Sequence, residues 1–203
     1  MQSDDWVSVT KYVRGMVMSG EMQLLEQAKA GNLRAFEELV SSYEKKIYNY
    51  CLRMTNSRED AEDLTQEVFV RVYKNIKSFK GGSQLSTWIY RIAHNICIDR
   101  YRKSKASVVS LNQPKGEDDE REIDLPSGSP SPEEHVIRSE QQKLLLNCIS
   151  RLKPEYQTVI ILRDIQHFSY EEIAGILNLP LGTVKSHINR ARAALRDAVR
   201  PHL

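Results

Sequence analysis

Long apolar stretches are absent from this chain of 203 residues. No run of about 18 or more apolar residues occurs, so the sequence predicts no transmembrane helix and no membrane insertion. The first twenty residues, MQSDDWVSVTKYVRGMVMSG, are acidic at their start and lack the apolar segment of a secretion signal. We therefore expect the protein to stay in the cytoplasm.

Cysteines are few, with Cys51, Cys97 and Cys148 far apart in the sequence. An odd number without a CxxC pair argues against a disulfide framework. Each cysteine occupies an apolar helical position, so we expect buried thiols. His94 and Cys97 alone are too few ligands for a metal site, and the sequence predicts neither a metal nor another cofactor.

Alternating strand patterns and hairpin signals are missing too, whereas apolar residues recur at helical spacing. The fold class is therefore expected to be all-α. One predicted helix, at 83–103, carries an apolar stripe containing Leu85, Ile89, Ile92 and Ile96. Its opposite side contains Thr87, Tyr90, His94 and Tyr101. We expect something outside the protein to contact this side; the alternative is a solvated face with aromatic rings from neighbouring packing.

Charge is unevenly distributed, although the net charge is only +2. Residues 104–132 are rich in Ser, Gly, Pro, Asp and Glu, a composition typical of a flexible linker. The linker is acidic, whereas the segments 23–103 and 133–203 each hold more Lys and Arg than Asp and Glu. The sequence thus predicts two small helical domains joined by an acidic linker, after an N-terminal extension at 1–22. Two basic domains indicate that the protein contacts a polyanion at two places.

The segment SYEEIAGILNLPLGTVKSHINRARAAL, residues 169–195, has the pattern of a helix-turn-helix. Ser169 and Glu172 form a capping box, Asn178 suits a left-handed turn, and Thr183 is expected to cap the second helix. That helix would expose hydrogen-bond donors for bases or phosphates at Lys185, Ser186, Asn189, Arg190 and Arg192. Its start, Thr183 to Lys185, could hold a phosphate on free backbone N–H groups. The alternative is an ordinary charged surface helix.

Two longer motifs extend this interpretation. AEDLTQEVFVRVYKNIKSF followed by STWIYRIAHNICIDRYRK resembles the second conserved region of bacterial RNA polymerase sigma factors, and the helix-turn-helix resembles their fourth region. No third-region domain fits between them, so the resemblance is to the extracytoplasmic-function group of the sigma-70 family. It implies that the protein is a sigma factor, which directs promoter-specific transcription initiation, and not an enzyme. The implied partners are core RNA polymerase, through its β′ clamp helices and β flap, together with promoter DNA and an anti-sigma factor.

The resemblance also implies roles for individual residues. The core polymerase surface would contain Asp60, Asp63, Gln66, Glu67 and Arg71, although these carboxylates also suit a solvated helix start. The pocket for a flipped minus-10 base would contain Lys80, Gly81, Gly82, Ser83, Gln84 and Asn95. Aromatic and cationic side chains that hold melted DNA would be Trp88, Tyr90, Arg91 and Arg100, although Trp88, at the edge of the apolar stripe, could instead be purely a core residue. The readers of the duplex minus-35 element would be Thr183, Lys185, Ser186, Asn189, Arg190 and Arg192. Leu85 departs from the family, which often has an aromatic residue there.

Two other functions remain open from the residues alone. A stand-alone helix-turn-helix regulator would share the C-terminal motif but would need a dimer interface or a sensor domain. A metal-dependent nuclease would use the acidic residues Glu59, Asp60, Glu62, Asp63 and Glu67. No histidine or second carboxylate group completes such a metal site.

Overall fold

The computed structural model describes residues 20–110 and 143–202, which form helices and turns without any β-strand. The all-α prediction is confirmed. The first part contains a helix at 20–29, α2 (Leu33–Thr55), α3 (Arg58–Asn75), a short 3-10 turn (Ile76–Ser78) and α4 (Leu85–Ser110). The second part contains a helix at 143–150, α6 (Pro154–Ile160), a π-helical turn (Ile161–Ile165), α7 (Tyr170–Leu177), α8 (Leu181–Val199) and a final 3-10 turn (Arg200–His202). Within these ranges no helix has the length and apolar character needed to cross a membrane.

Local capping signals explain where α2 and α3 begin and end. The side chain of Asn32 accepts a hydrogen bond from the Ala35 N–H at the start of α2. Asn56 ends that helix in the left-handed conformation, with φ of 52°. Ser57 then caps α3 by accepting from the Asp60 N–H, and the acidic first turn of α3 complements the helix dipole.

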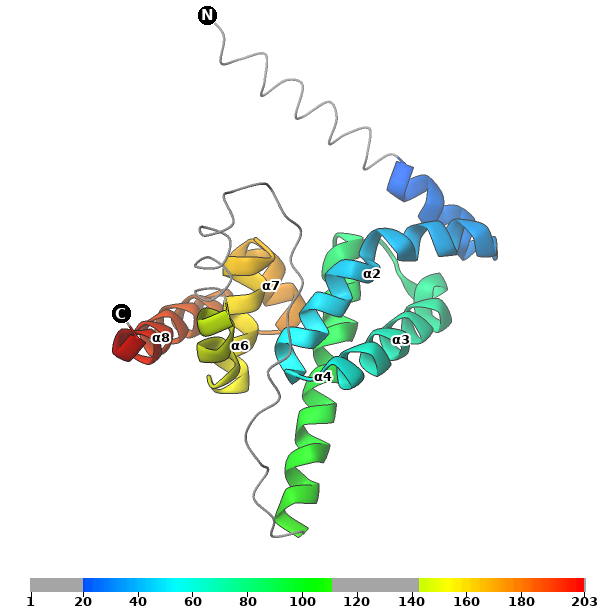
Figure 1. The fold of residues 1–203 in the computed structure, drawn as a ribbon. Coiled ribbons are helices and arrows are strands. Elements are labelled where there is room, and N and C mark those ends of the chain that lie inside the picture. The colour runs from blue at the N-terminus through cyan, green and yellow to red at the C-terminus, as the bar shows by residue number, and fades with distance from the viewer. Residues whose placement is uncertain (1–19, 111–142, 203) are drawn as a thin grey trace, which may run out of the picture.

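The N-terminal body consists of α2, α3 and α4 packed around one core (Figure 1). The predicted stripe of α4 is confirmed, because Leu85, Ile89 and Ile96 are buried and Ile92 is partly buried. Ile47 and Tyr50 of α2 are fully buried against this stripe. Each such side chain contributes about 1.5–3 kcal/mol by leaving water.

The N-terminal body extends beyond both boundaries of the predicted first domain, residues 23–103. Helical residues begin at 20, and the carboxylate of Glu21 accepts a hydrogen bond from the Tyr43 hydroxyl. The helix α4 continues past the expected end at 103 to Ser110, since neither Gly nor Pro interrupts it there. The rest of the expected linker lies outside the described residues.

The C-terminal body follows most of the predicted turn signals. As predicted, Ser169 and Glu172 form the capping box of α7, and Asn178 is left-handed with φ of 53°. Pro154 is the first residue of α6. The expected cap at Thr183 is wrong, because the N-cap of α8 is Pro180, three residues earlier. The Pro180 carbonyl accepts from the N–H groups of Thr183 and Val184, which closes the first turn.

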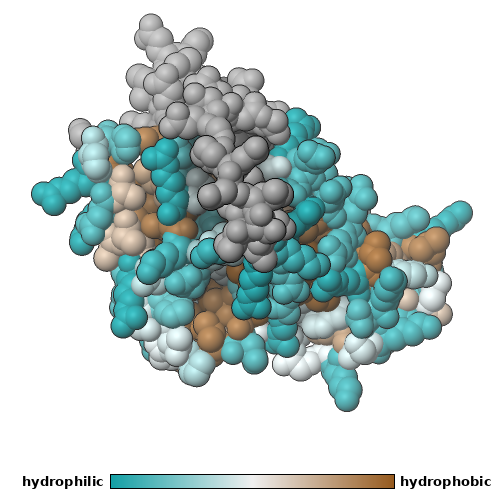
Figure 2. All heavy atoms as spheres, turned by 90° about the horizontal axis from the view of Figure 1, so that it is seen from below, coloured by the Kyte–Doolittle hydropathy of each residue, from teal (hydrophilic) through white to brown (hydrophobic). Residues whose placement is uncertain are grey.

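The two bodies lie against each other, with α7 packed on α4 and α6 close to α2 (Figure 1). Their buried apolar side chains form one continuous cluster, from Leu25 in the first helix to Ala191 in α8. The face seen in Figure 2 is largely hydrophilic, with hydrophobic side chains in separate patches. The chain thus adopts a closed arrangement, which we define by the contact between α4 and α7.

Candidate functional site

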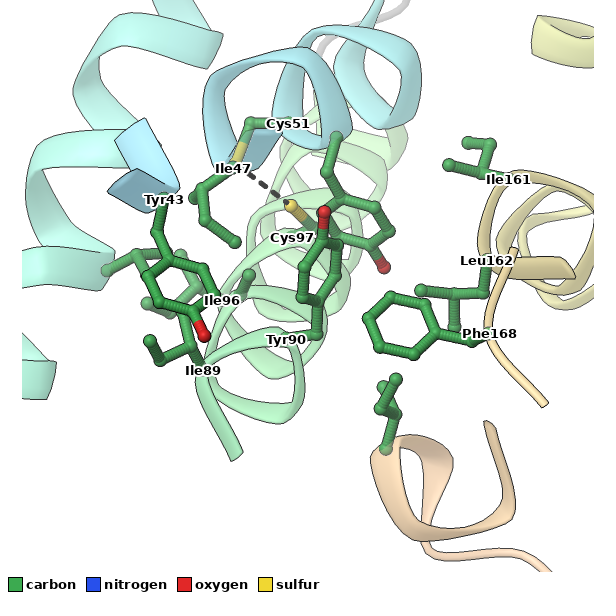
Figure 3. Close-up of a cluster of buried hydrophobic side chains, with 14 of the residues drawn as sticks. Tyr43, Ile47, Cys51, Ile89, Tyr90, Ile96, Cys97, Ile161, Leu162 and Phe168 are labelled. Carbon is green, nitrogen blue, oxygen red and sulfur yellow. Dashed lines mark hydrogen bonds between the residues drawn. The ribbon is translucent and has the colours of Figure 1, made fainter. Parts of the chain in front are cut away.

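The first half of the α4 side that was expected to meet an outside partner is covered by the chain's own C-terminal body, whereas Tyr101 farther along stays exposed. Thr87 is 3% exposed and Tyr90 is 1% exposed, so the expectation that both face outward is wrong in this arrangement. The Tyr90 ring meets the Phe168 ring edge-on, with centroids 4.8 Å apart (Figure 3). Its hydroxyl donates to Oε1 of Gln166 at 2.9 Å. Tyr90 therefore cannot stack on a base while the chain is closed.

Two polar contacts also join the two bodies, one between α4 and α7 and one between α6 and α2. Nε of Arg91, a residue expected to touch DNA, donates instead to the Gly175 carbonyl in α7 at 2.8 Å. Nε2 of Gln157 in α6 donates to the Arg53 carbonyl in α2 at 2.6 Å. Gly175 lets the helices approach, since a Cβ there would lie 3.3 Å from Cγ2 of Thr87. The closed arrangement is thus held by polar as well as apolar contacts.

The remaining residues expected at the minus-10 element lie on or beside the start of α4. The loop from Lys80 to Gln84 is exposed except for the half-buried Ser83, and Gly81 has φ of +73°, which favours glycine. Trp88 is half-buried, with its ring centroid 5.3 Å from that of Phe79. Asn95 is exposed, but it lies ten residues after Leu85, about 15 Å along the helix. The helix itself therefore does not bring Asn95 next to the loop.

The residues expected at the polymerase surface separate into two groups. Asp60 and Asp63 face α4, where Arg100 lies 3.1 Å and 3.7 Å from their carboxylates. This pairing also engages Arg100, which was expected to touch DNA. On the outer surface, Glu67 pairs with Arg71 at 2.5 Å. The first group therefore links α3 to α4, and the second remains exposed.

Gln66 lines an apolar groove between α2 and α3, with a volume of about 480 Å³. We call it the α2–α3 groove; its lining consists of Leu33, Phe36, Glu44, Thr65, Gln66, Phe69, Val70 and Tyr73. Val70 is 50% exposed and Tyr73 is 55% exposed. Val70 and Tyr73 were not predicted from the sequence, although they lie off the buried stripe of α3 and so indicate a binding surface.

Helix α8 presents part of the expected minus-35 surface. Lys185, Asn189 and Arg190 are exposed, whereas the hydroxyl of Ser186 donates to the Thr183 carbonyl at 2.8 Å. Arg192 pairs with Asp164 at 2.5 Å, and this carboxylate raises the pKa of the guanidinium. The expected phosphate position at Thr183 to Lys185 is wrong, since Thr183 and Val184 already donate their N–H groups to Pro180.

The three cysteines are buried and free, as expected. The Sγ atoms of Cys51 and Cys97 lie 3.9 Å apart in the core (Figure 3). The hydrogen bond between them, together with burial, raises the pKa of the Cys97 thiol. Among residues 20–110 and 143–202, no three His, Cys, Asp or Glu side chains are grouped to hold a metal ion, and this includes the acidic face of α3.

His94 gives a testable pH dependence. Burial, together with the charge of Arg102, lowers the pKa of His94 to about 4. Because an unfolded histidine has a pKa of about 6.5, only the unfolded chain takes up this proton between those values. The free energy of unfolding is therefore expected to fall by about 3 kcal/mol as the pH drops from 7 to 4. Urea denaturation of the parent and His94→Gln should show a flatter pH dependence for the variant; equal slopes would contradict this.

Comparisons with known proteins agree with this architecture. The sigma-70 region 2 family matches residues 39–107, which include most of α2 and all of α3. The sigma-70 region 4 family matches residues 142–195, which include α6, α7 and most of α8. Both matched segments fall on the two bodies described above, in that order along the chain.

Individual relatives are similar over nearly the whole chain. The ECF RNA polymerase sigma factor SigW of Bacillus subtilis is 40% identical over 177 residues, covering 87% of this chain and 95% of the relative. The RNA polymerase sigma-H factor of Pseudomonas aeruginosa is 33% identical over 190 residues, covering 90% of this chain and 95% of the relative. These relatives are named as sigma factors, which are not enzymes.

Two solved structures share the fold. One is CnrH in complex with the cytosolic domain of CnrY, with a TM-score of 0.65 and 23% identity, covering 90% of this chain and 98% of that chain. The other is the sigma factor RpoE in complex with the anti-sigma factor NepR from Bartonella quintana, with a TM-score of 0.65 and 24% identity, covering 81% and 96%. With both regions matched and relatives this similar, the chain belongs to the extracytoplasmic-function (ECF) group of RNA polymerase sigma factors in the sigma-70 family.

Proposed function

We propose that this chain binds core RNA polymerase and directs initiation at specific promoters. In this proposal α8 reads the minus-35 element as duplex, and the N-terminal body captures bases of the melted minus-10 element. The ordered match to sigma regions 2 and 4 in one chain carries the proposal. The exposed donors of α8 and the α2–α3 groove support it, because they supply a basic helix for DNA and an apolar surface for a protein.

The polymerase surface that we propose is centred on the α2–α3 groove. A protein interface usually has an apolar centre and a polar rim. Val70 and Tyr73 would form the centre, with Gln66, Glu67 and Arg71 at the rim. A helical partner such as the β′ clamp helices suits a groove of this kind. Contact with the β flap is proposed for the C-terminal body on the family resemblance alone.

The upstream contact is assigned to the exposed side of α8. We expect Arg190→Ala to weaken binding to upstream duplex DNA by about 10- to 100-fold, because one base or phosphate contact is worth about 1–3 kcal/mol. Binding to core polymerase should not change, since Arg190 lies outside the α2–α3 groove and the exposed side of α8 is assigned to DNA rather than to the β flap. Titrating promoter DNA with reconstituted holoenzyme measures the first quantity, and titrating core enzyme measures the second. An equal loss in both would reject this role.

The downstream contact is assigned to the loop before α4 and to Asn95. Asn95→Ala should reduce promoter opening about tenfold or more, while binding to closed promoter DNA changes little. The reason is that bases become available to this amide only after the duplex melts. Permanganate reactivity of unpaired thymines measures opening, and gel-shift titration at low temperature measures closed binding. Unchanged opening would overturn the assignment of Asn95.

The closed arrangement must open for this function. The two promoter elements are about 25 base pairs apart, which is about 80 Å of B-DNA at 34 Å per turn. A compact protein of this length has a radius of gyration of only about 17 Å. We therefore propose that α7 leaves α4 when the chain joins polymerase and DNA, which exposes Thr87 and Tyr90 and frees Arg91 from the Gly175 carbonyl.

An inhibitory protein partner is part of the proposal. The RpoE structure is described as a complex with an anti-sigma factor. A partner of that kind for this chain is inferred from family membership. Copurification of the chain with a protein that blocks its binding to core polymerase would support this inference, and retention of full core binding in that complex would contradict it.

A further inference from the structure

A cleft of about 590 Å³ lies between the two bodies, away from the Tyr90 contact. The second half of α4 forms one wall, with Ile98, Tyr101 and Arg102. The other walls come from the start of α6, the end of α7 and His187 of α8. Its volume lies within the range of about 300–1,000 Å³ that is typical of small-molecule sites.

The cleft is positively charged. Among the described residues, Arg102, Lys105 and Lys153 line it, against one carboxylate, that of Glu155. None of these three cations forms an ion pair within the described parts of the chain. Uncompensated cations that converge on one concave site raise the local concentration of anions. The charge therefore favours a ligand with several negative charges.

The cleft also has apolar and aromatic walls. Leu177 lines it from the end of α7, Leu179 from the turn that follows, and Tyr101, 46% exposed, from α4. Nδ1 of His187 is buried without a hydrogen-bond partner in the described chain. A buried ring nitrogen normally has a hydrogen-bond partner, and a polar atom of a bound ligand would supply the one that is missing here. An inorganic anion would make no apolar contact with these walls.

We propose that this cleft binds a small phosphorylated ligand with a flat ring, of the nucleotide class. The phosphates would lie among the three cations, and the ring would pack against Tyr101 and the two leucines. Both bodies line the cleft, so the ligand binds only the closed arrangement. A ligand present at ten times its dissociation constant would increase the closed population relative to the open one by about 11-fold. The resulting inhibition of transcription rests on the proposed function, whereas the binding itself does not.

Calorimetric titration of the full chain, without polymerase or DNA, tests the binding. The probes are adenosine triphosphate and inorganic tripolyphosphate, both without magnesium. We expect the nucleotide to bind with a submillimolar dissociation constant, at least tenfold more tightly than tripolyphosphate. No binding at 5 mM nucleotide would overturn the site, and equal affinity for both probes would overturn the role of the apolar walls.

Two double variants distinguish a specific binding site from nonspecific electrostatic attraction. Arg102→Gln with Lys105→Gln should weaken nucleotide binding at least tenfold. Lys45→Gln with Lys77→Gln removes the same charge at exposed positions outside the cleft and should change binding less than twofold. An equal loss in both would show nonspecific attraction and overturn the proposal.

Hydrogen exchange tests the link to the closed arrangement. Saturating adenosine triphosphate should slow amide exchange in α7 and in residues 87–95 of α4 at least threefold. Unchanged exchange despite measured binding would overturn the part of the proposal in which the ligand holds the two bodies together. Because these experiments contain no polymerase, their failure leaves the proposed sigma function untouched, and a failure of that function leaves them interpretable.

Discussion

Val70→Glu is expected to lower the affinity of the chain for core RNA polymerase by at least about 100-fold, or about 2.7 kcal/mol. Val70 is half-exposed on α3, in the α2–α3 groove beside Tyr73. In the complex the new carboxylate would be buried in an apolar contact without a partner, which is costly. The fold should survive, because the side chain is not in the core and Glu favours helix more than Val does. Titrating labelled chain with purified core enzyme measures the affinity.

Val70→Ile is the matched control for this experiment. It keeps the apolar surface and adds one methylene, so core affinity should stay within about threefold of the parent. Circular dichroism should show the same helix content for both variants. If Val70→Glu bound core enzyme as tightly as the parent while remaining folded, the α2–α3 groove would not be the polymerase surface.

Tyr90→Ala is expected to lower the free energy of unfolding by about 3–5 kcal/mol, the usual cost of truncating a large buried aromatic residue. The ring is buried between Tyr50 of its own body and Phe168 of the other, with centroid distances of 5.4 Å and 4.8 Å. Tyr90→Phe keeps both ring contacts and loses only the hydrogen bond to Gln166, so it should cost about 1 kcal/mol. Urea denaturation measures both values, and a small effect of Tyr90→Ala would contradict this packing.

A double-mutant cycle isolates the part of this effect that comes from the contact between the bodies. Tyr90→Ala and Phe168→Ala, alone and together, should show a coupling energy of about 0.5–1.5 kcal/mol for the aromatic pair. Additive effects would show that the closed arrangement is not populated in solution, and the prediction would then be wrong.

Features encoded by a few neighbouring residues could be predicted from the sequence. The capping box of Ser169 and Glu172 and the left-handed Asn178 depend on chemistry within one turn, so the helix-turn-helix was predictable. The cap at Thr183 failed because Pro180, with its restricted φ, supplies the first carbonyl of α8 instead. Two adjacent start signals competed there, and composition alone does not rank them.

Contacts between distant segments could not be predicted in the same way. Helical periodicity shows that Thr87 and Tyr90 share a face, but it does not show what covers that face. The close approach of Gly175 and the hydrogen bond from Arg91 depend on how two separately folded segments dock. The α2–α3 groove was missed for a related reason, because Leu33 and Tyr73 become neighbours only when two helices pack.

The central claim is that this chain gives core RNA polymerase its choice of promoter. It is tested most directly by transcribing genomic DNA of the bacterium that encodes the chain with purified core enzyme, with and without the chain. The 5′ ends of the RNA are then sequenced. The account predicts start sites that appear only with the chain and share sequence elements near minus-10 and minus-35. If the folded chain produced no new start sites, or sites without a shared upstream sequence, the account would be contradicted.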